Sequence, residues 1–145
     1  MRDDLIKAKE LLSRGHACAA CKDDTVYTAD GRGIAPLMSI IEKAGSLGGF
    51  TVCDKVIGSA AAYLMIEAGV SEAYAKTASK RAVKLFVTHN VVFSYSELTD
   101  FIKNRAGDGL CPMEKTALQM TAADGAYGIF KAKLKELKNE NNSGN

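Results

Sequence analysis

The sequence predicts one α/β domain with a single mixed sheet between two layers of helices. Its 145 residues, 47% of them hydrophobic, are enough for one full core. Segments with apolar residues at helical spacing alternate with short strand-like runs, and this alternation is typical of crossover units on a parallel sheet. One pair of strand-like runs is joined by a tight turn, which adds an antiparallel hairpin and makes the expected sheet mixed. The sequence has no repeat and no linker, so all the expected strands belong to one domain.

The first part of the chain is expected to form a helix, a hairpin and a second helix. Residues 3–13 carry apolar side chains at helical spacing and end just before a glycine that suits a helix C-terminus. Residues 16–22 and 25–28 are strand-like and are separated by a short polar turn, so we expect them to pair as an antiparallel hairpin. Residues 34 to about 45 have Pro36 in their first turn, which is a favourable position for proline.

The second part of the chain is expected to alternate strands with helices. Residues 50–53 form a short apolar run, which we expect to lead directly into an alanine-rich helix that begins at Asp54. Residues 72–77 are expected to form a strand, residues 79–89 a helix capped by a serine, and residues 91–94 another strand. We then expect one or two helical turns at residues 95–103, a helix with proline in its first turn at residues 112–120 and an amphipathic helix at residues 127–138. The domain is expected to span residues 1–138, and residues 139–145 to form a disordered tail.

Charge and composition argue against several classes of partner. The chain has 19 Lys and Arg against 17 Asp and Glu, a formal net charge of +2, and no tryptophan, so we expect no nucleic-acid partner. The N-terminal sequence M-R-D-D-L-I-K-A-K-E is charged, and no apolar run is long enough to span a membrane. We therefore expect a cytoplasmic protein with no membrane partner, in which the cysteines are reduced.

A C-x-x-C motif at Cys18 and Cys21 invites a zinc or redox interpretation. The motif lies in the expected first strand, where alternation would place the two side chains on opposite faces of the sheet. A zinc knuckle or a thioredoxin-type site needs a turn or a helix start at this point. We therefore predict that both cysteines are small buried core residues.

The stretch G-D-G-L-C-P-M-E, residues 107–114, indicates a candidate site at a helix start. Proline is favoured in the first turn of a helix, which places Cys111 at the N-terminus, where the helix dipole favours a thiolate. The expected helix at Asp54 begins beside Cys53 and Lys55. If the two helix starts face each other, these residues would converge with Glu114.

The loop before Cys111 could add an anion site. Its glycines, Gly107 and Gly109, allow close approach of backbone amides to a phosphate or carboxylate, and Asn104 and Arg105 lie in the same loop. Each of these features also has a purely structural explanation. In that interpretation the glycines make turns, and Asp54 caps a helix and pairs with Lys55. Glu114 is stabilised in the first turn by the dipole of its own helix, and Cys111 is a core thiol.

Three motifs follow one another along the chain: G-I-A-P-L (33–37), D-K-V-I-G-S-A-A-A (54–62) and N-R-A-G-D-G-L-C-P-M-E-K (104–115). Together they resemble an uncharacterised prokaryotic family assigned to the cytidine deaminase-like superfamily. The resemblance covers roughly residues 5–122. It implies a three-layer α/β/α sandwich with a mixed five-stranded sheet, in agreement with the element order, and it implies no established reaction.

Active members of that superfamily hold zinc with an H/C-x-E segment and a P-C-x-x-C segment at two helix starts. The resemblance implies that Cys53 takes the place of the first ligand and Lys55 that of the catalytic glutamate, while Cys111 and Glu114 take the places of the two cysteines. A lysine cannot replace the glutamate as a proton shuttle, and neither segment contains a histidine. We therefore expect no zinc and no other cofactor.

Three functions remain open at this point. The favoured one is a zinc-free protein that binds a nucleotide-like or other anionic small ligand, with ligand contacts from Lys55, Arg105 and the glycine loop. In that case Cys111 would be a candidate nucleophile, and Asp54 or Glu114 a candidate acid/base. The second is a non-catalytic, homo-oligomeric interaction or regulatory protein with a vestigial site. The third is a metal-dependent hydrolase with zinc held by Cys53, Cys111 and Glu114.

Overall fold

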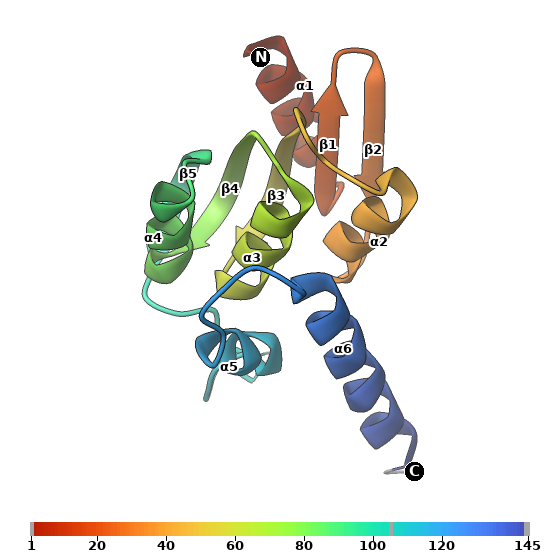
Figure 1. Ribbon diagram of the computed structural model, residues 1–145, viewed down its shortest axis with the longest axis vertical. Helices are drawn as coiled ribbons and strands as arrows, with labels where there is room; N and C mark the ends of the chain where they lie inside the picture. The colour runs from red at the N-terminus through yellow and green to blue at the C-terminus, as the bar shows by residue number, and fades with distance from the viewer. Residues whose placement is uncertain (1, 105, 144–145) are drawn as a thin grey trace.

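The protein is a five-stranded sheet with helices on both faces (Figure 1). The structure is a computed structural model that describes residues 2–104 and 106–143. Its strands are β1 (Cys18–Lys22), β2 (Thr25–Ala29), β3 (Thr51–Ile57), β4 (Glu72–Ser79) and β5 (Val92–Thr99). Its helices are α1 (Arg2–Ser13), α2 (Ala35–Ala44), α3 (Ser59–Ala68), α4 (Lys80–Thr88), α5 (Pro112–Leu118) and α6 (Ala126–Ser143).

The sheet is mixed, with strand order β2-β1-β3-β4-β5. β1 pairs antiparallel with both β2 and β3, whereas β3, β4 and β5 are parallel. The predicted hairpin and the predicted crossover units are therefore confirmed. The parallel strands require crossovers, which α3 and α4 supply.

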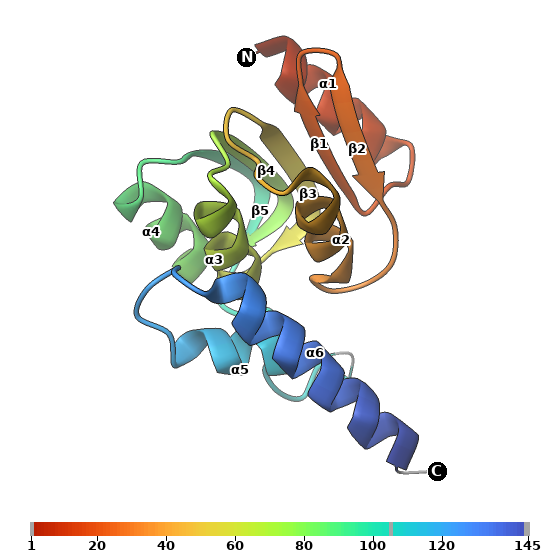
Figure 2. The ribbon, with the colours of Figure 1, turned by 45° about the vertical axis from the view of Figure 1, so that its right-hand side comes forward.

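The two faces of the sheet are covered unequally. α1 packs against β1, β3 and β4 on one face, and in Figure 2 it lies behind the β1–β2 hairpin. α2, α3 and α4 cover the other face, and α5 and α6 pack against α3 on its outer side. Most of the core lies on this second face, where the first seven residues of α3 are all buried. Alanines on this helix allow it to lie close to the sheet.

Three boundaries differ from those expected. β3 continues to Ile57, because it keeps its pairing with β4, so Asp54 and Lys55 lie in a strand and α3 begins only at Ser59. β5 continues to Thr99 in register with β4, so residues 95–99 are extended rather than helical. α6 continues to Ser143, so residues 139–143 of the expected tail are helical, and residues 144 and 145 lie outside the described residues.

The C-x-x-C cysteines lie in β1 and are both fully buried. Cys18 belongs to the main core on the α2–α4 face, and Cys21 to the smaller core under α1. The prediction that they occupy opposite faces is confirmed, so they cannot act together on one ion or as one redox pair.

No helix among the described residues is long and apolar enough to cross a membrane.

Candidate functional site

A pocket of about 240 Å³ lies where the end of β3, the start of α3, the loop before α2 and the segment that leads into α5 come together. We call it the β3–α5 pocket. Four of the residues expected at the site line it: Asp54, Lys55, Cys111 and Glu114. Its other walls are formed by side chains and glycines from the neighbouring elements: Ala17, Gly31, Arg32, Gly33, Ile34, Val56, Gly58, Ala60, Ala61, Ile102 and Met113.

Asp54 supplies a buried carboxyl group to this pocket. Its side chain lies on the α2–α4 face of β3, is only 6% exposed, and accepts a hydrogen bond from the backbone N–H of Val56 (3.3 Å). It also interacts with the thiol of Cys18 on the neighbouring strand β1. Burial raises the pKa of Asp54 from its ordinary 3.8 to about 7, because the charged form loses its hydration, although these hydrogen bonds and Lys55 oppose the shift. Asp54 can therefore gain or lose a proton near neutral pH.

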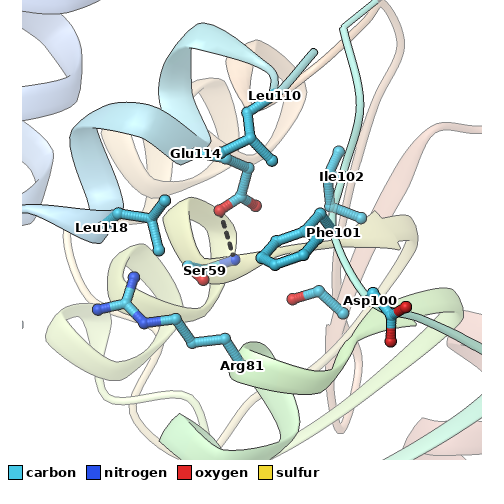
Figure 3. Close-up of a pocket in the computed structure, with 9 residues that line it drawn as sticks. Ser59, Arg81, Asp100, Phe101, Ile102, Leu110, Glu114 and Leu118 are labelled. Carbon is cyan, nitrogen blue, oxygen red and sulfur yellow. Dashed lines mark hydrogen bonds between the residues drawn. The ribbon is translucent and has the colours of Figure 1, made fainter. Parts of the chain in front are cut away.

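Glu114 joins the start of α5 to the start of α3. One carboxylate oxygen accepts the backbone N–H of Ser59 (3.0 Å), as the dashed line in Figure 3 shows. This N–H is one of the amides at the start of α3 that have no partner within the helix, so a side chain of α5 caps α3. Burial raises the pKa of Glu114, and the hydrogen bonds from the start of α3 oppose that rise. The two helix starts thus meet, but the helix that Glu114 stabilises is not its own.

Gly58 makes this contact possible. A Cβ atom built at this glycine would lie 1.5 Å from Oε1 of Glu114 and 2.6 Å from Cγ1 of Ile102. Any side chain here would displace either the carboxylate or the segment that leads into α5. The glycine of the D-K-V-I-G-S motif is therefore required by the close approach of these groups rather than by backbone conformation.

Two cationic side chains lie at the rim of the pocket. Arg32 comes from the loop before α2 and is exposed. Lys55 follows Asp54 in β3, so alternation turns it toward the α1 face, where its Nζ donates a hydrogen bond to the carbonyl oxygen of Gly15 (3.4 Å). Lys55 thus lies at the border between the pocket and the groove beside α1. Arg32 was not among the residues expected from the sequence.

Cys111 is the residue immediately before α5, as its position before Pro112 predicted. Its side chain is half-buried and lines the pocket, and its backbone N–H donates to the carbonyl oxygen of Ile102 (3.0 Å). This bond holds the start of α5 against the segment that follows β5. Cys111 and Asp54 therefore face the same pocket from two different elements.

The glycine loop does not contribute to the pocket. Asn104 accepts the N–H of Gly107 through Oδ1 (2.9 Å) and donates through Nδ2 to Asp108 (3.0 Å). The backbone N–H of Asn104 in turn donates to the carbonyl oxygen of Gly109 (2.9 Å). The structure therefore does not bring Asn104, Gly107 and Gly109 together with Asp54, because the loop folds on itself and none of the three lines the pocket. Arg105 lies outside the described residues.

The zinc ligand set considered for a hydrolase is not brought together. Cys53 is fully buried under α1, whereas Cys111 and Glu114 line the pocket beyond the opposite face of the sheet. The comparison with an H/C-x-E segment also fails, because residues 53–55 lie within β3 and not at a helix start. Within residues 2–104 and 106–143, no group of three His, Cys, Asp or Glu side chains has the arrangement of a metal site.

The family model for TM1506, a domain of unknown function (DUF1893), matches residues 6–134. This chain belongs to the DUF1893 family. A solved DUF1893 family protein from Thermotoga maritima is 26% identical, with a TM-score of 0.84 over 92% of this chain and 91% of that chain. The predicted resemblance to an uncharacterised family and the predicted five-stranded α/β fold are thus confirmed.

A second solved structure shares less with this DUF1893 chain. It is a diaminohydroxyphosphoribosylaminopyrimidine deaminase/5-amino-6-(5-phosphoribosylamino)uracil reductase from Thermotoga maritima, 17% identical over 65% of this chain and 35% of that chain, with a TM-score of 0.44. This chain spans about a third of that protein's length. The comparison with curated proteins found no match.

A small cavity on the other side of Glu114 shows how the DUF1893 chain fixes α5 in place (Figure 3). Arg81 of α4 lines this cavity and donates hydrogen bonds to the carbonyl oxygen of Ala117 (2.9 Å), to that of Met120 (3.4 Å) and to the hydroxyl of Tyr63 (3.2 Å). These bonds satisfy carbonyl groups at the end of α5, while the hydrogen bond of Glu114 with Ser59 holds the start of the helix. α5 is therefore anchored at both ends.

Replacing Glu114 by alanine is expected to lower the free energy of unfolding by about 1–3 kcal/mol, because the buried N–H of Ser59 loses its acceptor. Urea unfolding of the wild type and of Glu114→Ala measures this loss. Glu136→Ala, an exposed change on α6, is the matched control and should leave stability within about 0.5 kcal/mol. Equal stabilities for wild type and Glu114→Ala would show that the α5-to-α3 contact is not a cap.

Two residues of the site, Arg32 and Gly58, were not expected from the sequence, although each has a local signal there. The segment G-R-G-I-A-P places Arg32 between two glycines immediately before a helix, and Gly58 directly precedes Ser59 and the run of alanines. The signal at Gly58 was missed because α3 was expected to begin four residues earlier, which made this glycine a helix-interior residue. Its contact with Glu114 joins positions 56 residues apart, which no local pattern reveals.

Proposed function

We propose that this protein binds a small anionic, nucleotide-like ligand in the β3–α5 pocket. The observation that carries the proposal is the pairing of two buried carboxyl groups, Asp54 and Glu114, with Arg32 at the rim of the same pocket. Such a combination of convergent polar groups with raised pKa values in a concave, largely apolar site is typical of binding and active sites.

The carboxyl groups favour a ligand ring that carries N–H donors. Asp54 lies deep at the end of β3, and its carboxyl can either accept or donate a hydrogen bond near neutral pH. A heterocycle with neighbouring N–H and acceptor groups would replace the hydration that the carboxyl lost on folding. The walls formed by Ile34, Ile102 and Met113 provide apolar contact for the faces of such a ring.

The cations favour an anionic group at the mouth of the pocket. A guanidinium binds phosphate or carboxylate through two parallel hydrogen bonds, and Arg32 is exposed and can reorient toward such a group. The glycines on either side of Arg32 line the pocket and leave room beside it. Lys55 is the second cation at the border of the pocket and strengthens the local positive potential.

If the pocket has a reaction, Cys111 and Asp54 are its candidate reactive groups. The half-buried thiol of Cys111 would act as nucleophile, and Asp54 would transfer a proton near neutral pH. Glu114 is less suited to proton transfer, because a carboxylate oxygen of Glu114 is engaged with Ser59. We therefore propose Glu114 as a positioning residue.

Binding of inorganic phosphate and of nucleoside monophosphates, measured by isothermal titration calorimetry, tests the proposal. We expect Arg32→Ala to weaken nucleotide binding by about 10- to 100-fold, the loss of one charge-assisted contact. Arg14→Ala is the matched control, because Arg14 is exposed and pairs with Glu10 on α1. Failure of the whole nucleotide panel to bind, or equal weakening by both variants, would contradict the proposal.

A further inference from the structure

The outer edge of β5 is an unprotected strand edge. β5 is the last strand of the sheet, and no strand of the described chain pairs with its outer side. Its eight residues, V-F-S-Y-S-E-L-T, include no proline, no lysine and a single charge at Glu97. Proteins usually blunt such edges with lysine, proline, bulges or a covering segment, because free N–H and C=O groups otherwise pair with another strand.

Exposed apolar side chains gather around the same edge. Five large hydrophobic residues that are at least 41% exposed lie on β5 or in the segments beside it: Val87, Val92, Tyr95, Leu98 and Phe101. Two nearby charged side chains, Lys80 and Asp100, neutralise each other in an ion pair (2.7 Å). The edge therefore offers backbone hydrogen bonds and apolar surface together, with little charge to repel an identical edge.

We propose that two copies of this chain pair through β5, antiparallel and about a two-fold axis, to form one continuous sheet. A two-fold axis perpendicular to the sheet presents the same strand in opposite directions, which is the arrangement that antiparallel pairing requires. This inference concerns a different surface from the β3–α5 pocket and does not rest on the proposed function.

The backbone of β5 restricts the register of this pairing. The N–H of Val92 donates to the carbonyl oxygen of Ser71, on the β4 side. Because N–H directions alternate along a regular strand, Val92 and Ser94 face β4, whereas Phe93 and Tyr95 face outward; the pairing with β4 is interrupted only beyond them, at Ser96. The two-fold axis can pass through a hydrogen-bonded pair, at an outward-facing residue, or through a non-hydrogen-bonded pair, at the residue between two outward-facing ones.

Among the possible centres, Tyr95 is the one that fits best. A centre at Glu97 would place two carboxylates directly opposite each other, which is destabilising. Centres at Phe93 or Thr99 would pair less than half of the strand, and a centre at Ser94 would pair only residues 92–96. A centre at Ser96 would leave Val92 unpaired and place Glu97 opposite Tyr95. With Tyr95 opposite its own copy, Phe93 lies opposite Glu97 and Val92 opposite Leu98, so the pairing includes residues 92–98.

Sedimentation equilibrium at micromolar concentration tests whether the chain is a dimer, with Tyr95→Pro as the test variant. Proline removes only an outward-facing N–H, so the pairing of β5 with β4 stays intact while the dimer weakens by at least about tenfold in Kd. Val26→Lys on β2, the opposite edge strand, is the matched control and should leave the dimer unchanged. A monomeric wild type, or a dimer that Val26→Lys dissociates, would overturn the proposal. Circular dichroism confirms that each variant is folded.

Cross-linking tests the register independently of dimer strength. In a Cys111→Ser background, Tyr95→Cys places two thiols opposite each other across the axis, at about 5.5 Å between Cα atoms, and mild oxidation should join the two chains. Glu97→Cys places its thiol opposite Phe93 of the other copy and should not cross-link. A covalent dimer from Glu97→Cys but not from Tyr95→Cys would overturn this register, and so would equal cross-linking of both. Cross-linking of neither variant would overturn pairing through β5.

Discussion

Gly58→Ala is expected to lower the free energy of unfolding by about 2–4 kcal/mol, because the new methyl group would overlap the Glu114 carboxylate. Relief of that overlap requires the start of α5 to move away from α3. The movement removes the acceptor from the N–H of Ser59 and opens the wall of the β3–α5 pocket. Thermal unfolding followed by calorimetry measures the loss.

Gly128→Ala is the matched control for this change. Gly128 lies inside α6, and nothing lies within 4 Å of the Cβ that alanine would add. Alanine has the higher helix propensity, so this variant should be more stable than the wild type by up to about 1 kcal/mol. If Gly58→Ala were as stable as Gly128→Ala, the contact between Glu114 and the start of α3 would be wrong.

Asp54→Asn is expected to stabilise the protein above neutral pH and to flatten its pH profile. The folded protein holds the Asp54 proton up to about pH 7, whereas the unfolded chain releases it near 3.8. Between these values the folded state binds more protons, so stability falls as the pH rises through this window. The shift corresponds to a cost of up to about 4 kcal/mol above pH 7, which asparagine avoids because it carries no charge.

Urea unfolding of wild type and Asp54→Asn at a series of pH values measures this effect. The wild type should lose stability between about pH 4 and pH 7, and the variant should lose much less. A smaller slope of the same sign should remain in Asp54→Asn, since burial also raises the pKa of Glu114. The exposed change Asp24→Asn serves as control. A wild type that becomes more stable across this range would show that Asp54 is not a buried carboxyl of raised pKa.

The sequence was informative where local periodicity decides structure. The hairpin, the alternation of strands with helices and the position of Cys111 before α5 follow from spacing, turn residues and the place of Pro112. The cysteines of β1 were assigned to opposite faces by the two-residue period of a strand, which tertiary contacts do not change.

The sequence was less informative where tertiary pairing overrides local preference. Residues 95–99 resemble a short helical segment in isolation, but pairing with β4 extends β5 to Thr99. The same pairing carries β3 through Asp54 and Lys55 and so moves the start of α3 to Ser59. Because of this shift, Lys55 and Asp54 point to opposite faces of β3, and Gly58 lies at the junction with α3 rather than inside the helix. The loop around Asn104 lies away from the pocket, and the Asn104 side chain already accepts the N–H of Gly107, which no local pattern in the sequence reveals.

The cap on α3 also has a consequence for how the chain is made. All five strands end before residue 100, whereas Glu114 follows them in the sequence. During synthesis from the N-terminus, the complete sheet and α3 can emerge from the ribosome while the N–H of Ser59 still has no protein acceptor. Translation of the last third of the chain then supplies both the acceptor for this N–H and the α5 wall of the pocket.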